Sequence, residues 1–133
     1  FGTPAMRGVF NDAALVERYV EVEIALAQAE AKVGLIPAEA AREIAARCDA
    51  KQIDHAKLKA ETDVVGYPIV GIVHQMAKQC GDAGRFVHWG ATTQDIMDTA
   101  TVLQLRDALA LVDTDLAAIE AALLHHAKTH RER

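Results

Sequence analysis

The sequence predicts an all-α protein, and three observations support this prediction. Apolar residues recur at alternating steps of three and four through most of the chain, which is the period of one face of an α-helix. Residues 91–133 contain neither glycine nor proline, the residue types that most often interrupt helices. Side chains that cap helix N-termini stand where periodic segments begin, at Asn11 or Asp12 and at Thr92.

Two amphipathic helices are expected in the first third of the chain. The first starts at Asn11 or Asp12 and ends at Gly34, which can adopt the left-handed conformation that stops a helix. Its apolar face carries Leu15, Tyr19, Val22, Leu26, Ala29 and Val33. The second is shorter and has Pro37 in its first turn, where the missing N–H does no harm. Its apolar face carries Ala41, Ile44, Ala45 and Cys48.

The middle of the chain is less regular. The segment "DHAKLKAE" predicts a brief helical turn. The segment "YPIVGIVHQMAKQC" has the β-branched content of a strand, but Met76, Ala77 and Cys80 continue a helical face, so we predict a helix. Gly81 and Gly84 then interrupt the chain.

A long helix is expected to follow Gly90. Its apolar positions again alternate by three and four: Val102, Leu105, Leu109, Val112, Leu116, Ile119 and Leu123. This pattern predicts one helix of roughly 35 residues, about 50 Å long at 1.5 Å per residue. The short helices before it cannot cover such a rod, so we expect it to pack against long helices from elsewhere.

Composition excludes several classes of function. The chain has 133 residues, 51% of them hydrophobic, and a formal charge of −5, so a nucleic-acid partner is not expected. It has no apolar run long enough for a membrane span and no signal-peptide pattern, so a cytoplasmic location is expected. Cys48 and Cys80 lie outside any CxxC motif and are interpreted as small buried hydrophobic residues.

Both ends of the chain suggest a fragment. It begins at Phe1 without an initiator methionine and ends in "HAKTHRER" without a helix stop signal. We expect an N-terminal helical domain over residues 1–90 and a truncated long helix over residues 91–133.

The segment "RFVHWGATTQDIMDTA" concentrates reactive side chains at the start of the long helix. A structural interpretation is a capping box, in which Thr92 caps the helix and Asp95 bonds back to the cap. That interpretation leaves the second hydroxyl at Thr93, the flexible Gly90 and His88 unexplained.

A longer stretch, "VHWGATTQDIMDTATVLQLRDAL", resembles the first conserved region of the fumarase/aspartase superfamily. It is most similar to the 3-carboxy-cis,cis-muconate cycloisomerases, and the adenylosuccinate lyases are a little further off. Residues 5–41 resemble the N-terminal helices of both groups, and "AKTHRER" resembles the segment before their next active-site motif. The resemblance implies an all-helical homotetramer of the L-aspartase-like fold, in which residues 91–133 start one helix of a shared central bundle and each active site draws residues from three subunits.

The resemblance also implies the chemistry. These enzymes add to, or eliminate from, a fumarate-like unit through a doubly charged aci-carboxylate state. Similarity to the cycloisomerases implies a small polycarboxylate substrate, one carboxylate of which adds intramolecularly to a fumarate-like double bond during aromatic-acid catabolism. One alternative is an adenylosuccinate lyase-like C–N lyase that releases fumarate. An alternative of another class is a non-catalytic helical oligomerisation module.

Five residues are candidates for the site. Thr92 and Thr93 are expected to bind a carboxylate, because hydroxyl donors at a helix N-terminus favour an anion. His88 matches the histidine of the motif and is the catalytic candidate, either contacting substrate or moving a proton. Gln94 is expected to reach the substrate. Arg7 lies where adenylosuccinate lyases have an arginine that helps hold the substrate phosphate.

Two departures from the family pattern bear on substrate and activity. Adenylosuccinate lyases carry a histidine before an Asp-Val-Val stretch, whereas "ETDVVGYP" has Thr62 there, or Tyr67 in an ungapped match. This argues for the cycloisomerase group, although that group's glycine-asparagine pair before Ile-Pro is absent too. The family's serine-bearing loop and second histidine motif would lie beyond Arg133, so the chain alone is expected to be inactive.

No cofactor and no metal ion are expected. His126 and His130 stand one helical turn apart, but no acidic partner completes an HExxH pattern. The acidic stretch "VEVE" at residues 20–23 is interpreted as a helix with alternating exposure rather than as a pair of catalytic carboxylates.

Overall fold

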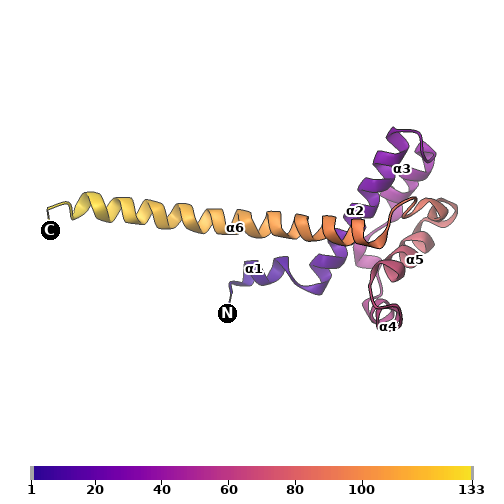
Figure 1. The fold of residues 1–133 in the computed structure, drawn as a ribbon, viewed down its shortest axis with the longest axis horizontal. Helices are drawn as coiled ribbons and strands as arrows, with labels where there is room; N and C mark the ends of the chain where they lie inside the picture. The colour runs from indigo at the N-terminus through magenta and orange to yellow at the C-terminus, as the bar shows by residue number, and fades with distance from the viewer. Residues whose placement is uncertain (1, 133) are drawn as a thin grey trace.

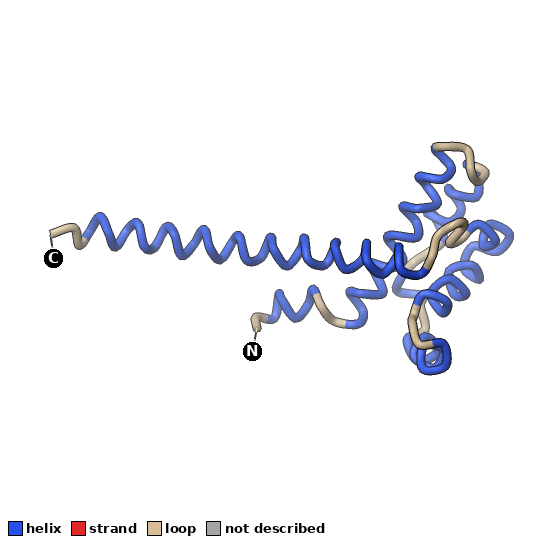
Figure 2. The backbone as a smooth tube through the Cα atoms, viewed as in Figure 1, coloured by secondary structure: helices blue, strands red, loops and turns tan. Residues whose placement is uncertain are grey.

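A computed structural model describes residues 2–132 and is helical throughout its regular elements (Figures 1 and 2). The described elements are α1 (Pro4–Val9), α2 (Asp12–Lys32), α3 (Ala38–Arg47), η1 (Ala50–Gln52), α4 (His55–Val65), α5 (Ile69–Cys80), η2 (Gly81–Phe86) and α6 (Thr93–Thr129), where η denotes a 3₁₀ helix. The all-α prediction is confirmed.

Local capping explains most of the helix boundaries. Asn11 caps α2 by accepting the Ala14 N–H at 2.8 Å, and Gly34 follows the helix with a φ of +79°, as the sequence predicts. Pro37 directly precedes α3 rather than lying within its first turn. Its φ of −60° already suits the helix that it introduces.

The middle of the chain is more helical than expected at one place. The segment predicted as a brief turn is α4, an 11-residue helix capped by Asp54, which accepts the Lys57 N–H at 3.0 Å. Gly66 ends it in the left-handed conformation, with a φ of +95°. The prediction of a helix rather than a strand is confirmed for α5.

The core lies where α2, α3, α5 and the first turns of α6 meet. Its fully buried large side chains are Ile44, Ile69, Ile72, Met76 and, unusually, Glu23. Cys48 and Cys80 are free, buried and separated by only 3.6 Å between their sulfur atoms. Burial, together with the neighbouring Cys80, raises the pKa of Cys48 to about 12, so this thiol is unreactive at neutral pH.

The long helix α6 has two different parts. Its first turns pack on the core and bury Ile96, Ala100, Gln104 and Ala108. An ion pair between Arg18 and Asp107 joins α6 to α2, and the Gln104 side chain donates to the Val9 carbonyl at 2.7 Å. The rest of α6 projects from the helical cluster as a bare rod (Figure 1).

Helix α6 carries, along both of these parts, the apolar stripe that its sequence predicts. The helix has 37 residues, which corresponds to about 55 Å. Exposed large apolar side chains along it are Val102, Leu105, Leu109, Val112, Leu116, Ile119, Leu123 and Leu124. The expectation that this chain cannot cover the helix is therefore confirmed. Across residues 2–132, no helix combines the length and apolar character that a membrane crossing requires.

Candidate functional site

The N-terminus of α6 is built as the sequence predicts. Thr92 is the N-cap residue and forms a capping box with Asp95, whose Oδ2 accepts the Thr92 N–H at 2.9 Å. Asp95 is thereby engaged in the cap. The first backbone N–H groups of any helix have no partner within the helix, so this end attracts an anion.

The two remaining polar residues of the motif differ in availability. Thr93 is half-buried at the first position of α6, and its hydroxyl has no hydrogen-bond partner among residues 2–132. Gln94 is exposed, and its Nε2 donates to Asp98 Oδ1 at 2.5 Å within the same helix. Thr93 is therefore the better-placed donor for a ligand at the helix start.

His88 is held in an unusual backbone conformation just before this helix. Its φ is +61°, which makes it the only non-glycine residue with a positive φ in the described part of the chain. Side-chain-bearing residues rarely adopt this left-handed region, and it persists only where the surroundings enforce it. Here the His88 ring folds onto α2, where its Nδ1 lies 2.7 Å from Oε1 of Glu23.

Glu23 is a buried carboxylate that the sequence analysis missed. Its side chain is fully buried, while that of His88 is 18% exposed. Burial raises the pKa of Glu23, and the adjacent His88 opposes that rise by favouring the carboxylate. The interpretation of "VEVE" as alternately exposed is wrong for Glu23, because α2 packs against α3 and α6 and the His88 ring lies against Glu23.

A second buried glutamate lies two turns further along α2. Glu30 is 7% exposed, and burial raises its pKa as well. The Oε2 atoms of Glu23 and Glu30 are both buried without a hydrogen-bond partner within residues 2–132. The seven-residue spacing that places both on one helix face was the available sequence signal.

A groove of about 440 Å³ runs beside these groups, between α2 and the start of α6. Glu30, Trp89, Gly90 and Asp95 contribute to its lining. Gly90 has a φ of +68°, and a Cβ placed on it would lie 3.9 Å from Glu30 Oε1. The expectation that Gly90 allows a bend and a close approach is confirmed.

Arg7 lies apart from the other candidates within this chain. It is exposed on α1, and its Nη1 donates to the Gly2 carbonyl at 2.5 Å. The end of α1 contacts α6 at Gln104, about 18 Å along the helix from Thr92 at 1.5 Å per residue. The structure thus gathers His88, Thr92, Thr93 and Gln94 in one region and leaves Arg7 outside it.

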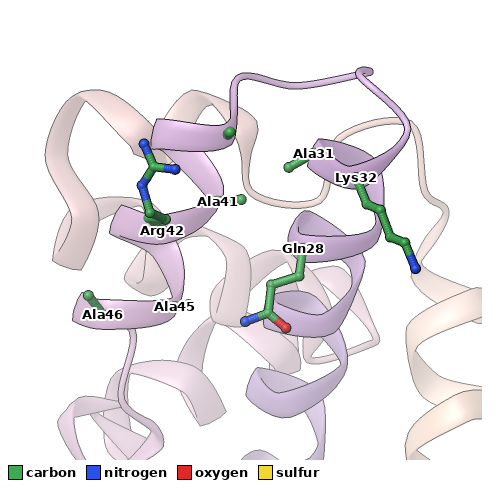
Figure 3. Close-up of a pocket in the computed structure, with 8 residues that line it drawn as sticks. Gln28, Ala31, Lys32, Ala41, Arg42, Ala45 and Ala46 are labelled. Atoms are coloured by element: carbon green, nitrogen blue, oxygen red, sulfur yellow. The ribbon is translucent and has the colours of Figure 1, made fainter.

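Another hollow, between α2 and α3, lacks the chemistry of the motif (Figure 3). Alanines form much of its lining, the Gln28 side chain reaches toward α3, and Lys32 extends away from it. Arg42 is already paired with Glu39. Among residues 2–132, no group of three or more histidine, cysteine, aspartate or glutamate side chains is arranged to hold a metal ion.

Comparison with known proteins identifies the family. Residues 2–132 match the family described as "Lyase", which is nearly the whole chain. The chain belongs to this lyase family. The resemblance to the fumarase/aspartase superfamily that rests on the residues 87–109 motif is thereby confirmed.

Individual relatives differ in the activities that their names state. The chain is 48% identical to trans-aconitate decarboxylase 1 of Mycosarcoma maydis, over 98% of this chain and 27% of that protein. It is 44% identical to 3-carboxy-cis,cis-muconate cycloisomerase of Acinetobacter baylyi, over 94% of this chain and 29% of that protein.

A solved structure supports the same relationship. The β-carboxy-cis,cis-muconate cycloisomerase from Acinetobacter calcoaceticus superposes with a TM-score of 0.93 and 41% identity, over 99% of this chain and 32% of that one. The chain spans about 30% of the length of the curated relatives that it matches.

Proposed function

We propose that this lyase-family chain supplies the anion-binding end of an active site that acts on an unsaturated polycarboxylate. The observation that carries the proposal is the start of α6, where the Thr93 hydroxyl, which has no hydrogen-bond partner among residues 2–132, and the first N–H groups of the helix follow His88 by a few residues. A carboxylate bound there gains negative charge in the aci-carboxylate state. Fixed donors at this place stabilise that state more than the ground state.

The proposed roles follow from where each candidate side chain lies and from the hydrogen bonds that it already makes. Thr92 and Thr93 bind the carboxylate whose adjacent carbon reacts, and His88 contacts the substrate or moves its proton. Gln94 reaches the substrate once it releases Asp98. Arg7 is retained as a substrate-binding candidate that would act on a site formed with another copy of the chain, because the end of its helix contacts α6 at Gln104, about 18 Å along the helix from Thr92.

The substrate that we propose is 3-carboxy-cis,cis-muconate or a similar polycarboxylate, with ring closure by intramolecular carboxylate addition in aromatic-acid catabolism. The names of two relatives support the class, because aconitate and carboxymuconate are both unsaturated tricarboxylates. The alternative, an adenylosuccinate lyase-like reaction, is weakened at Thr62. Thr62, or Tyr67 in an ungapped match, stands where those lyases have a histidine, and the Thr62 hydroxyl donates to the Leu58 carbonyl of its own helix at 2.8 Å.

We further propose that the intact cytoplasmic protein is a homotetramer, with residues 1–90 as a helical domain and residues 91–133 entering a shared bundle. The support is the exposed apolar stripe of α6, which a monomer leaves in water. A non-catalytic oligomerisation module would use the same stripe. The two functions differ in whether the α6 N-terminus matters for turnover.

The test is Thr93→Val in the full-length parent protein. Loss of the diene absorbance of 3-carboxy-cis,cis-muconate reports turnover, beside a parallel assay with adenylosuccinate. Removing one oxyanion-type donor lowers kcat by about 10²- to 10³-fold, with assembly unchanged. The matched control is Thr101→Val, because the Thr101 hydroxyl only bonds to the Met97 carbonyl at 2.9 Å on the exposed helix surface. Unaltered turnover in Thr93→Val would favour the oligomerisation module.

A further inference from the structure

We infer that Glu23 is the positioning residue of His88: its buried carboxylate holds Nδ1 of the ring and leaves Nε2 as the nitrogen that meets the substrate. This inference rests on the proposed function, because Glu23 acts through the histidine that we place in the site. It assigns a role to a residue on α2 that lies 65 positions before His88 in the sequence.

The first support is the geometry of the pair. Oε1 of Glu23 lies 2.7 Å from Nδ1, within the range of a strong hydrogen bond to a charged group. The Glu23 side chain is fully buried, so its carboxylate cannot turn to water. Nδ1 and Nε2 lie on different sides of an imidazole ring, and Nε2 has no partner among residues 2–132. The ring therefore has one nitrogen fixed and one available.

The second support is the backbone of His88. With a φ of +61°, His88 departs from the conformations that residues with side chains prefer. A more relaxed backbone would direct the ring elsewhere. The hydrogen bond to Glu23 stabilises this backbone conformation, because the conformation brings the ring to a carboxylate inside the core.

The third support is the cost of burying the carboxylate. Glu23 sits among the largest fully buried side chains, and its second oxygen, Oε2, has no hydrogen-bond partner within the described chain. A buried carboxylate is unfavourable unless a partner offsets its lost hydration. His88 is the partner that the structure supplies. A leucine at this position would fill the core without this desolvation cost, so we attribute the presence of the Glu23 carboxylate to its hydrogen bond with His88.

The pair has a defined chemical consequence. While Glu23 is ionised it accepts a hydrogen bond from Nδ1–H in both proton states of the ring. A neutral ring then presents the lone pair of Nε2 and can accept a proton. A protonated ring presents Nε2–H, which can donate to a substrate carboxylate, while Glu23 stabilises the positive charge. A carboxylate behind a histidine performs this orienting work in hydrolytic triads.

The experiment is a double-mutant cycle in the full-length parent protein. Glu23→Gln keeps the size of the side chain and removes its charge. We expect kcat to fall on the order of 10-fold or more, with KM little changed, because orientation of the ring matters in the transition state. In a His88→Asn background the same substitution should cause no further loss. Glu21→Gln on the exposed side of α2 is the matched control and should leave turnover unchanged.

The outcomes separate the inference from the proposed function. If His88→Asn turns over as fast as the wild type, the proposed role of His88 fails, and the inference fails with it. If His88→Asn is slow but Glu23→Gln is silent, or if the two losses multiply in the double variant, only the inference is overturned. Should Glu23→Gln fold poorly by circular dichroism, Glu23→Asp replaces it in the cycle, with a smaller loss expected.

A spectroscopic measurement locates the proton on the His88 ring without an activity assay. Nitrogen NMR of protein labelled only at histidine distinguishes a proton on Nδ1 from one on Nε2. We expect the His88 signals, assigned by their loss in His88→Asn, to show Nδ1 protonated in the wild type. In Glu23→Gln the signals should show a changed distribution of the ring proton between Nδ1 and Nε2. Identical His88 signals in the two proteins would overturn the inference.

Discussion

Replacing three residues of the apolar stripe on α6 with serine should cause the proposed homotetramer to dissociate. The change is a triple substitution, Leu116→Ser, Ile119→Ser and Leu123→Ser, in the full-length parent protein. These side chains are 56%, 54% and 63% exposed in the single chain and lie on one side of the helix. They form no part of the core described above, so their loss should leave the fold of each chain intact.

The magnitude follows from the surface that remains to be buried. Burying a whole leucine or isoleucine side chain contributes about 1.5 to 3 kcal/mol. Slightly more than half of each side chain is available to an interface, so the three together represent roughly 3 to 5 kcal/mol per chain. At 1.4 kcal/mol for each tenfold change, association should weaken by about 10²- to 10⁴-fold.

Sedimentation velocity over a dilution series measures the effect, with circular dichroism to confirm that helix content is retained. The control is Thr114→Ser combined with His125→Ser, which introduces serine on the opposite side of α6 and should leave association unchanged. An assembly that survives the triple substitution at the same concentrations would refute the reasoning. Equal disruption by the control would show that helix propensity, and not the stripe, is responsible.

Two further predictions concern stability. Gly84→Ala should lower the free energy of unfolding by about 1 to 3 kcal/mol, because its Cβ would lie 2.4 Å from the Ala77 carbonyl oxygen of α5. Urea denaturation tests this against Gly8→Ala, where a Cβ meets nothing within 4 Å, and equal stability of the two variants would contradict the packing described. Burial raises the pKa of Glu30 above its unfolded value, so the folded state binds the extra proton and stability should fall as pH rises above about 4.3. Glu30→Gln should flatten this dependence in denaturation curves from pH 4 to 8, and a slope equal to that of the wild type would count against it.

Features that depend on neighbouring residues were accessible from the sequence. The capping box of Thr92 and Asp95 joins residues three apart, and it forms as predicted. The apolar stripe of α6 repeats with the helical period. The sequence therefore predicts both the stripe and the fact that the short helices of the chain cannot cover its whole length. The family motif rests on the same local stretch of residues.

Features that join distant segments were not accessible. Cys48 and Cys80 were expected to be buried, but their 3.6 Å contact depends on how α3 meets α5. The brief turn expected before α5 became an 11-residue helix, because Leu58 is buried and Gly71 of α5 packs against it. Tertiary contacts extended that helix beyond what its own periodicity indicated.

The sequence by itself determined the helices, the cap at the start of α6 and the hydroxyls displayed there, because hydrogen bonds between near neighbours and a regular apolar period specify them. Only the tertiary structure decided that Glu23 is buried while Glu21 is exposed, and that His88 bonds to Glu23 across 65 residues. The physical reason is that burial depends on which face of α2 the rest of the chain covers. A helix spacing indicates which side chains share a face, and packing alone determines what lies against that face.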